Sequence, residues 1–210
     1  MIPVHGLPTI CLITSATEAE LALVAQLVDV GARWFQLRVK DGPDREFFAR
    51  GIRLQNQLAG SDALFSVNDR ADIAAGCGAG GLHLGQRDLD LADARRLLPD
   101  ACIGVSVHDG MEAEHAAGAD YVGTGALFTT QTKANARPLS DDRRRAVQCA
   151  FRGPIVGIGG IEPANVGRLP PLGIRHVAVS HAVFGAADPI AAFLAIAAGL
   201  GAAPTDAAGR

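Results

Sequence analysis

The sequence predicts a single (β/α)8 TIM barrel of the α/β class, and three observations support that fold. Eight short apolar runs recur along the 210 residues, and a segment with helical periodicity follows each of them. Such alternation is typical of βαβ units and a parallel sheet. The runs are apolar almost throughout, as strands buried on both faces are. Eight units in about 200 residues suit a small barrel, whereas an open doubly wound sheet would not need the eighth unit.

The expected elements follow one another in order. Strands are expected at 9–14, 34–37, 63–67, 81–84, 102–105, 121–124, 155–158 and 176–179. Helices are expected at 18–30, 45–59, 70–76, 91–97, 111–117, 141–150, 164–169 and 189–197. Gly31, Gly118 and Gly173 each precede a strand and suit the position just beyond a helix. No linker-like stretch divides the chain, so we expect one barrel domain over 1–200 and a loose tail over 201–210.

Composition excludes several classes of protein. A hydrophobic fraction of 49% with 20% charged residues excludes a disordered chain. The net charge of −3 gives no basic excess for nucleic acid, and no apolar run approaches the ~18 residues that span a bilayer. The N-terminus lacks a cationic lead before its short apolar stretch, so we expect a cytoplasmic protein. The four cysteines lack zinc-site spacing, and Cys11 and Cys102 are expected to be buried.

Barrel active sites lie at the carboxyl ends of the strands, and polar residues stand at seven of these ends. In chain order the candidates are Gln36, Arg38, Lys40, Asn68, Asp69, His83, Asp88, Ser106, His108, Thr130, Thr132, Lys133, Gly159, Val179 and Ser180. Alternation places Gln36, Arg38 and Lys40 on one side, toward the barrel mouth. Each residue alone has an ordinary explanation: an aspartate can cap a helix, a cation can be a solvated surface group, and His83 can be a packed core histidine. A purely structural barrel does not require all seven ends to be polar.

The mixture of groups indicates two anion sites. Asp69 and Asp88 follow neighbouring strands and suit Mg²⁺ held by few protein ligands together with a substrate phosphate. Arg38, Lys40 and Lys133 supply cations for phosphate oxygens. The glycine turn after the seventh strand and the serine after the eighth match the metal-free phosphate site common in barrels. No spacing of Cys, Ser, His and Asp argues for covalent catalysis.

Six phrases of the chain resemble the thiamine phosphate synthase family. They are QLRVK (36–40), VNDR (67–70), GLHLGQRD (81–88), GVSVH (104–108), ADYVGTGALFTTQTK (119–133) and IVGIGGI (155–161). They run in family order and cover most of the chain. The GIGGI phrase alone is weak evidence, because many phosphate-binding barrels carry it. NDR, HLGQ-x-D and the Thr-x-Thr-Lys insertion are together far more specific.

The resemblance implies a reaction and a role for each candidate residue. A hydroxymethylpyrimidine diphosphate would lose diphosphate, and a thiazole phosphate nitrogen would capture the pyrimidine methylene to give thiamine phosphate. Gln36, Arg38, Lys40 and Asn68 would hold the pyrimidine diphosphate, Asp69 and Asp88 would bind Mg²⁺, Ser106 would lie near the pyrimidine, and Lys133 near the diphosphate. Thr130, Thr132, Gly159, Val179 and Ser180 would receive the thiazole phosphate. Arg38, Ser106 and Lys133 are the residues expected to act in catalysis.

The chain also departs from the family pattern, and two alternatives stay open. Val39 stands where the family commonly has Glu, Gly80 where it has Asp, Thr129 where it has Pro, and His181 where it has a small residue. The first alternative is the related thiazole tautomerase, which would use His108 for proton transfer. The second is a barrel that binds a phosphorylated ligand without turnover. The oligomeric state, a homo-oligomer included, is left open.

Overall fold

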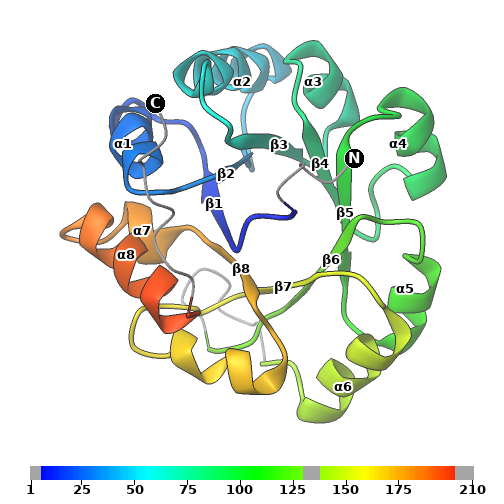
Figure 1. Cartoon of the computed structure of the whole chain (residues 1–210). Coiled ribbons are helices and arrows are strands. Elements are labelled where there is room, and N and C mark those ends of the chain that lie inside the picture. Colours follow the sequence, from blue (N-terminus) through cyan, green and yellow to red (C-terminus); the bar gives the residue numbers. More distant parts are fainter. Residues whose placement is uncertain (1–5, 130–137, 202–210) are drawn as a thin grey trace.

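The computed structural model describes residues 6–129 and 138–201, within which eight parallel strands close into a barrel (Figure 1). The strands are β1 (Ile10–Thr14), β2 (Trp34–Leu37), β3 (Leu64–Asn68), β4 (Gly81–Leu84), β5 (Cys102–Val107), β6 (Tyr121–Gly125), β7 (Ile155–Ile158) and β8 (His176–Val179). Each strand pairs with the next, and β8 pairs back with β1. The expected (β/α)8 barrel is confirmed, with every strand within two residues of its expected bounds.

Helices surround the strands on the outside of the barrel (Figure 1). They are α1 (Glu18–Asp29), α2 (Asp44–Leu58), α3 (Ala71–Gly76), α4 (Leu91–Leu97), α5 (Gly110–His115), α6 (Asp141–Ala150), α7 (His181–Phe184) and α8 (Pro189–Gly199). The first helix begins with a capping box, in which Thr17 and Glu20 satisfy each other's backbone N–H groups. None of the helices in the described part of the chain has the length and apolarity needed to traverse a bilayer.

The prediction of an α-helix over 164–169 is wrong. The chain instead forms two 3₁₀ turns between β7 and β8, η1 (Val166–Arg168) and η2 (Pro170–Leu172). Pro170 and Pro171 have no backbone N–H to donate, and a proline disfavours the helical conformation of the residue before it. The short helix α7, directly after β8, was not expected from the sequence.

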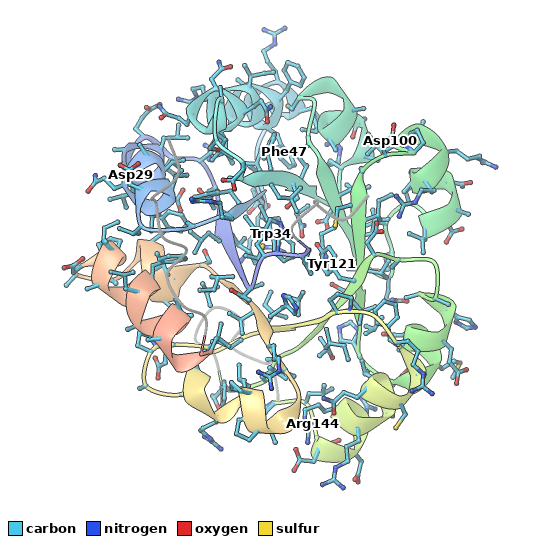
Figure 2. All side chains as sticks on the ribbon, in the orientation of Figure 1. Asp29, Trp34, Phe47, Asp100, Tyr121 and Arg144 are labelled. Carbon is cyan, nitrogen blue, oxygen red and sulfur yellow. The ribbon has the colours of Figure 1, made fainter. Side chains whose placement is uncertain are left out.

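Strand side chains alternate between the barrel interior and the layer beneath the helices. Trp34 lies in the interior, where it packs edge-on against Tyr121 with ring centroids 5.0 Å apart, whereas its neighbour Phe35 packs in the outer layer. Figure 2 shows Trp34 and Tyr121 within the ring of strands. Cys11 and Cys102 are buried in the same interior cluster, as expected, and burial raises the pKa of the Cys102 thiol to about 12.

Candidate active site

Four polar side chains lie on the interior side of β2 to β5, near the carboxyl ends of these strands. Gln36 lies two residues beyond Trp34, on the interior side of β2. Asn68 is in register with His83 on the neighbouring strand, and His83 Nε2 lies 2.8 Å from Ser106 Oγ on the strand after that. Gln36 and Asn68 are buried, and the other two are half-buried. The strand β5 is longer than expected, so Ser106 belongs to the strand and not to the loop behind it.

Asp69 and Asp88 form a carboxylate pair beside this group. The Asp69 backbone N–H donates to the carbonyl oxygen of His83 over 2.7 Å, which ties the aspartate to the end of β4. Loss of water around its carboxyl group and the neighbouring Asp88 carboxylate raise the pKa of Asp69 to about 6, while Arg38 and Asn68 oppose the rise. Two like charges this close disfavour each other unless a cation lies between them.

Neither aspartate of the pair caps a helix, which removes the ordinary explanation for both. Helix α3 begins after Arg70, and α4 begins after Asp90, each without a side-chain hydrogen bond to the helix. Asp88 Oδ2 instead accepts from the backbone N–H of Gly85 over 2.6 Å, within the loop after β4. Asp69 has φ +67°, a left-handed conformation uncommon outside glycine. The two loops therefore place both aspartates after the carboxyl ends of β3 and β4, and neither at a helix N-cap.

Arg38 supplies positive charge to the same corner of the mouth. It directly follows β2, and its backbone N–H donates to the carbonyl of Thr14 over 2.8 Å. Its positive charge lowers the pKa of both Asp69 and His83, so it acts electrostatically on both groups. Two residues further along, Lys40 is exposed at the same strand end.

The ends of β7 and β8 form the second side of the mouth. Gly159 and Gly160 both have positive φ, +94° and +66°, which favours glycine at this turn. The loop after β6 lies directly against them: the backbone N–H of Phe128 donates to the Gly159 carbonyl over 3.0 Å, and a Cβ at Gly159 would lie 2.6 Å from that of Ala126. The diglycine turn therefore lets the two loops approach closely.

The remaining candidates differ in what the structure says of them. Ser180 is exposed at the start of α7. The Val179 side chain is buried in the outer hydrophobic layer, so only its backbone can face a ligand at the mouth. Thr130, Thr132 and Lys133 lie outside the described residues.

Two residues that the family resemblance gave no role, His83 and Gln86, contact this site. His83 was read as a packed histidine, yet it joins Ser106 to Tyr121 by hydrogen bonds of 2.8 and 3.0 Å. Gln86 donates from Nε2 to the carbonyl oxygen of Ser106 over 2.6 Å. The alternation of His83 with Gly81 and the polar phrase that follows were the available signal. His108, by contrast, is an exposed side chain beyond β5 whose Nδ1 lies 2.9 Å from Glu112 Oε2.

Polar groups gathered at the carboxyl end of a closed parallel barrel are the arrangement of (β/α)8-barrel enzymes, and the fold and the site together define that class. The family model for thiamine monophosphate synthase matches residues 10–183. The chain belongs to that family.

Individual relatives agree with the family match. The thiamine-phosphate synthase of Moorella thermoacetica is 43% identical over 82% of this chain and 84% of its own length. That of Pyrococcus abyssi is 38% identical over 81% and 84%. Among solved structures, thiamine phosphate pyrophosphorylase from Pyrococcus furiosus superposes with a TM-score of 0.80 at 32% identity, covering 91% of this chain and 94% of that one.

Proposed function

We propose that the chain is a Mg²⁺-assisted thiamine-phosphate synthase. The carbon–oxygen bond between the pyrimidine methylene and the diphosphate breaks, diphosphate leaves with the bonding electrons, and the thiazole nitrogen forms the new bond to that methylene. The observation that carries the proposal is the Asp69–Asp88 pair with Arg38 beside it at the barrel mouth. Family membership supports the same reaction. The direct test is the formation of thiamine phosphate from the two purified substrates.

The donor set fits Mg²⁺ bound by few protein groups. Within the described part of the chain no three Asp, Glu, His or Cys side chains gather as a metal cluster. The Asp69–Asp88 pair would supply hard oxygen ligands. The two carboxylates repel each other when both are ionised, and a bound cation would reduce that repulsion. Mg²⁺ commonly uses one or two carboxylates plus substrate phosphates, and a bound ion would stabilise the negative charge of the departing diphosphate.

The chain's own groups then do the positioning. Arg38 lies close to the carboxylate pair, where its guanidinium can bind diphosphate oxygens as charge accumulates on them. Gln36, Asn68 and Ser106 line the adjoining interior and would orient the pyrimidine. An electron-rich aminopyrimidine carries positive charge at its methylene, so the reaction needs no covalent nucleophile. Lys40 and Lys133 are proposed to add charge at the diphosphate.

The opposite side of the mouth is proposed to hold the thiazole phosphate. The turn at Gly159 and the backbone at Val179 and Ser180 bring N–H groups to the ends of β7 and β8, a common place for phosphate in barrels. Thr130 and Thr132 are proposed to join them. Holding the thiazole opposite the diphosphate would align its nitrogen with the methylene, which is an orientation effect.

The departures from the family pattern leave the proposed ligands in place. Val39 packs against the outer hydrophobic layer and not into the mouth. A Cβ at Gly80 would lie 3.4 Å from Leu64 Cδ1, on the lower part of the barrel. His181 is exposed in the first turn of α7. The fourth departure, Thr129, directly precedes Thr130, and its carbonyl lies against Gly160 of the diglycine turn. Thr129 and His181 are therefore the two changes beside the proposed thiazole phosphate site.

His108→Asn is expected to keep synthase turnover within about tenfold of the wild type. In the proposed reaction the rate depends on diphosphate departure, and His108 is an exposed residue paired with Glu112, so its loss removes one hydrogen bond. A tautomerase would need this imidazole as its acid and base, worth about 10²–10⁴-fold. Steady-state assays measure the effect. A far larger loss, with deuterium exchange into the thiazole catalysed by the wild type alone, would favour tautomerisation.

We also propose that the chain acts in the cytoplasm on small phosphorylated substrates, without nucleic acid or a membrane. The net charge of −3 supports this, because a nucleic-acid binder needs a basic surface.

A further inference from the structure

A chain of hydrogen bonds leads from the barrel interior to the active-site mouth through three side chains. Tyr121 OH lies 3.0 Å from His83 Nδ1, and His83 Nε2 lies 2.8 Å from Ser106 Oγ. The histidine ring is stacked on the tyrosine ring, with centroids 5.5 Å apart and planes 23° apart. Trp34 closes the lower side by packing edge-on against Tyr121. This series of hydrogen bonds ends at Ser106, the residue proposed to contact the pyrimidine.

The neighbouring strands leave room for these rings. A Cβ at Gly104 would collide with the ring of Tyr121. A Cβ at Gly123 would lie 3.0 Å from His83 Cε1, tighter than ordinary packing. Glycine thus stands at the inward-facing positions that the two rings occupy. Gln86 adds a hydrogen bond to the Ser106 carbonyl, so the serine is held through both its backbone and its side chain.

The donors and acceptors of the three side chains decide which ring nitrogen of His83 carries the hydrogen. Tyr121 is buried, which raises the pKa of its phenol well above the usual value and keeps its hydrogen in place. Among the described residues, the hydrogen-bond partner of the Tyr121 hydroxyl is His83 Nδ1. A doubly protonated His83 ring would leave the buried Tyr121 hydrogen without this acceptor, so the contact requires a neutral ring with one N–H and one acceptor nitrogen. If Nδ1 accepts, then Nε2 carries the hydrogen and donates to Ser106.

The reverse arrangement is less favourable. A hydrogen on Nδ1 would point at Tyr121 and leave the phenol hydrogen without this acceptor, and a buried donor without a partner is costly. The Ser106 hydroxyl would then have to donate its own hydrogen to His83 Nε2. In the favoured arrangement Ser106 Oγ accepts a hydrogen bond from His83 Nε2, and the hydroxyl hydrogen is free to be donated to a ligand at the barrel mouth.

We propose that Tyr121 and His83 are positioning residues that present the Ser106 hydroxyl as a hydrogen-bond donor to an acceptor atom of the pyrimidine diphosphate. The inference rests on the proposed function for the identity of that ligand. The hydrogen-bond order within the protein does not depend on it. The two parts are therefore tested separately.

The hydrogen-bond order is tested on the protein without substrate. Nitrogen-15 spectra of histidine-labelled protein, with His83 assigned by its loss in His83→Gln, report which ring nitrogen carries hydrogen. We expect Nε2 to be protonated and Nδ1 unprotonated, and we expect Tyr121→Phe to weaken that preference. Protonated Nδ1 in the wild type would overturn the proposal even if the chain proves to be a synthase. The expected spectrum in a chain without synthase activity would refute the proposed function alone.

The consequence for the substrate is tested by a double-mutant cycle. Tyr121→Phe keeps the ring and should lower kcat by about threefold to tenfold, the effect of one hydrogen bond. In a Ser106→Ala background the same change should alter kcat by less than about twofold, because it acts through the serine. Ser66→Ala is the matched control: it removes a buried interior hydrogen bond, from Trp34 Nε1 to Ser66 Oγ at 2.9 Å, and should leave kcat unchanged. Equal losses from Tyr121→Phe in both backgrounds would show a merely structural role and overturn the proposal.

Discussion

Asp69→Asn and Asp88→Asn are each expected to lower synthase turnover by about 100-fold or more. Each change removes one proposed Mg²⁺ ligand from the place where negative charge would accumulate on the departing diphosphate, and the loss of one such electrostatic contact has this scale. Steady-state kinetics at saturating Mg²⁺ measures the effect. Asparagine keeps the shape of the side chain and tolerates the left-handed backbone of Asp69, so the fold should survive.

Stability and a nearby aspartate provide the controls for this prediction. The folded-state pKa of Asp69 is raised from 3.8 to about 6, so folding becomes less favourable as the pH rises through that window. Asp69→Asn removes that charge and should therefore raise the midpoint temperature of thermal unfolding at pH 7 without Mg²⁺. The same change should lower synthase activity. Asp90→Asn, an exposed change two residues beyond Asp88, should leave turnover unaltered. Near-wild-type turnover of both Asp69→Asn and Asp88→Asn would contradict the assignment of the pair.

Arg38→Ala is expected to lower kcat/KM for the pyrimidine diphosphate by about 100-fold. The guanidinium lies close to the carboxylate pair, and a bidentate contact to the diphosphate would strengthen as the leaving group gains charge. The thiazole phosphate is proposed to bind across the mouth, so its affinity should change by less than about twofold. Arg38→Lys should recover only part of the activity, because a lysine cannot reproduce the planar fork.

Calorimetry with each ligand separates the two outcomes. Arg45→Ala removes an exposed arginine at the start of α2 and controls for the change in net charge. Equal loss of affinity for both ligands in Arg38→Ala would show that the residue supports the fold or that its assignment is misplaced.

Periodicity and glycine placement predicted the strands well, because strands buried on both faces are short apolar runs between breakers. The residues at which the strands and helices end were harder to predict. β5 continues through Ser106 and Val107 because these residues pair in register with Gly123 and Thr124 of β6, and that pairing depends on a partner distant in the sequence. The segment at 164–169 has the apolar spacing of a helix, but the two prolines that follow limit it to 3₁₀ turns.

The candidate site was predictable where alternation decides which way a side chain points. It placed Gln36 in the interior, and the neighbouring strand ends brought Asp69 and Asp88 together. Alternation also places the Val179 side chain outside the barrel, whereas its backbone role was implied only by family likeness. The contact of His83 on β4 with Tyr121 on β6 passes over the intervening strand β5 and was not visible in the sequence, because it depends on how the strands pair and curve.

The central claim is tested most directly by a product assay on the purified chain. The chain is supplied with hydroxymethylpyrimidine diphosphate and thiazole phosphate, with Mg²⁺ or with excess chelator, and thiamine phosphate and diphosphate are both quantified. We expect the two products in equal amounts, only when both substrates and Mg²⁺ are present. Undiminished turnover in excess chelator would contradict the metal assignment, and no thiamine phosphate from the complete mixture would contradict the proposed function.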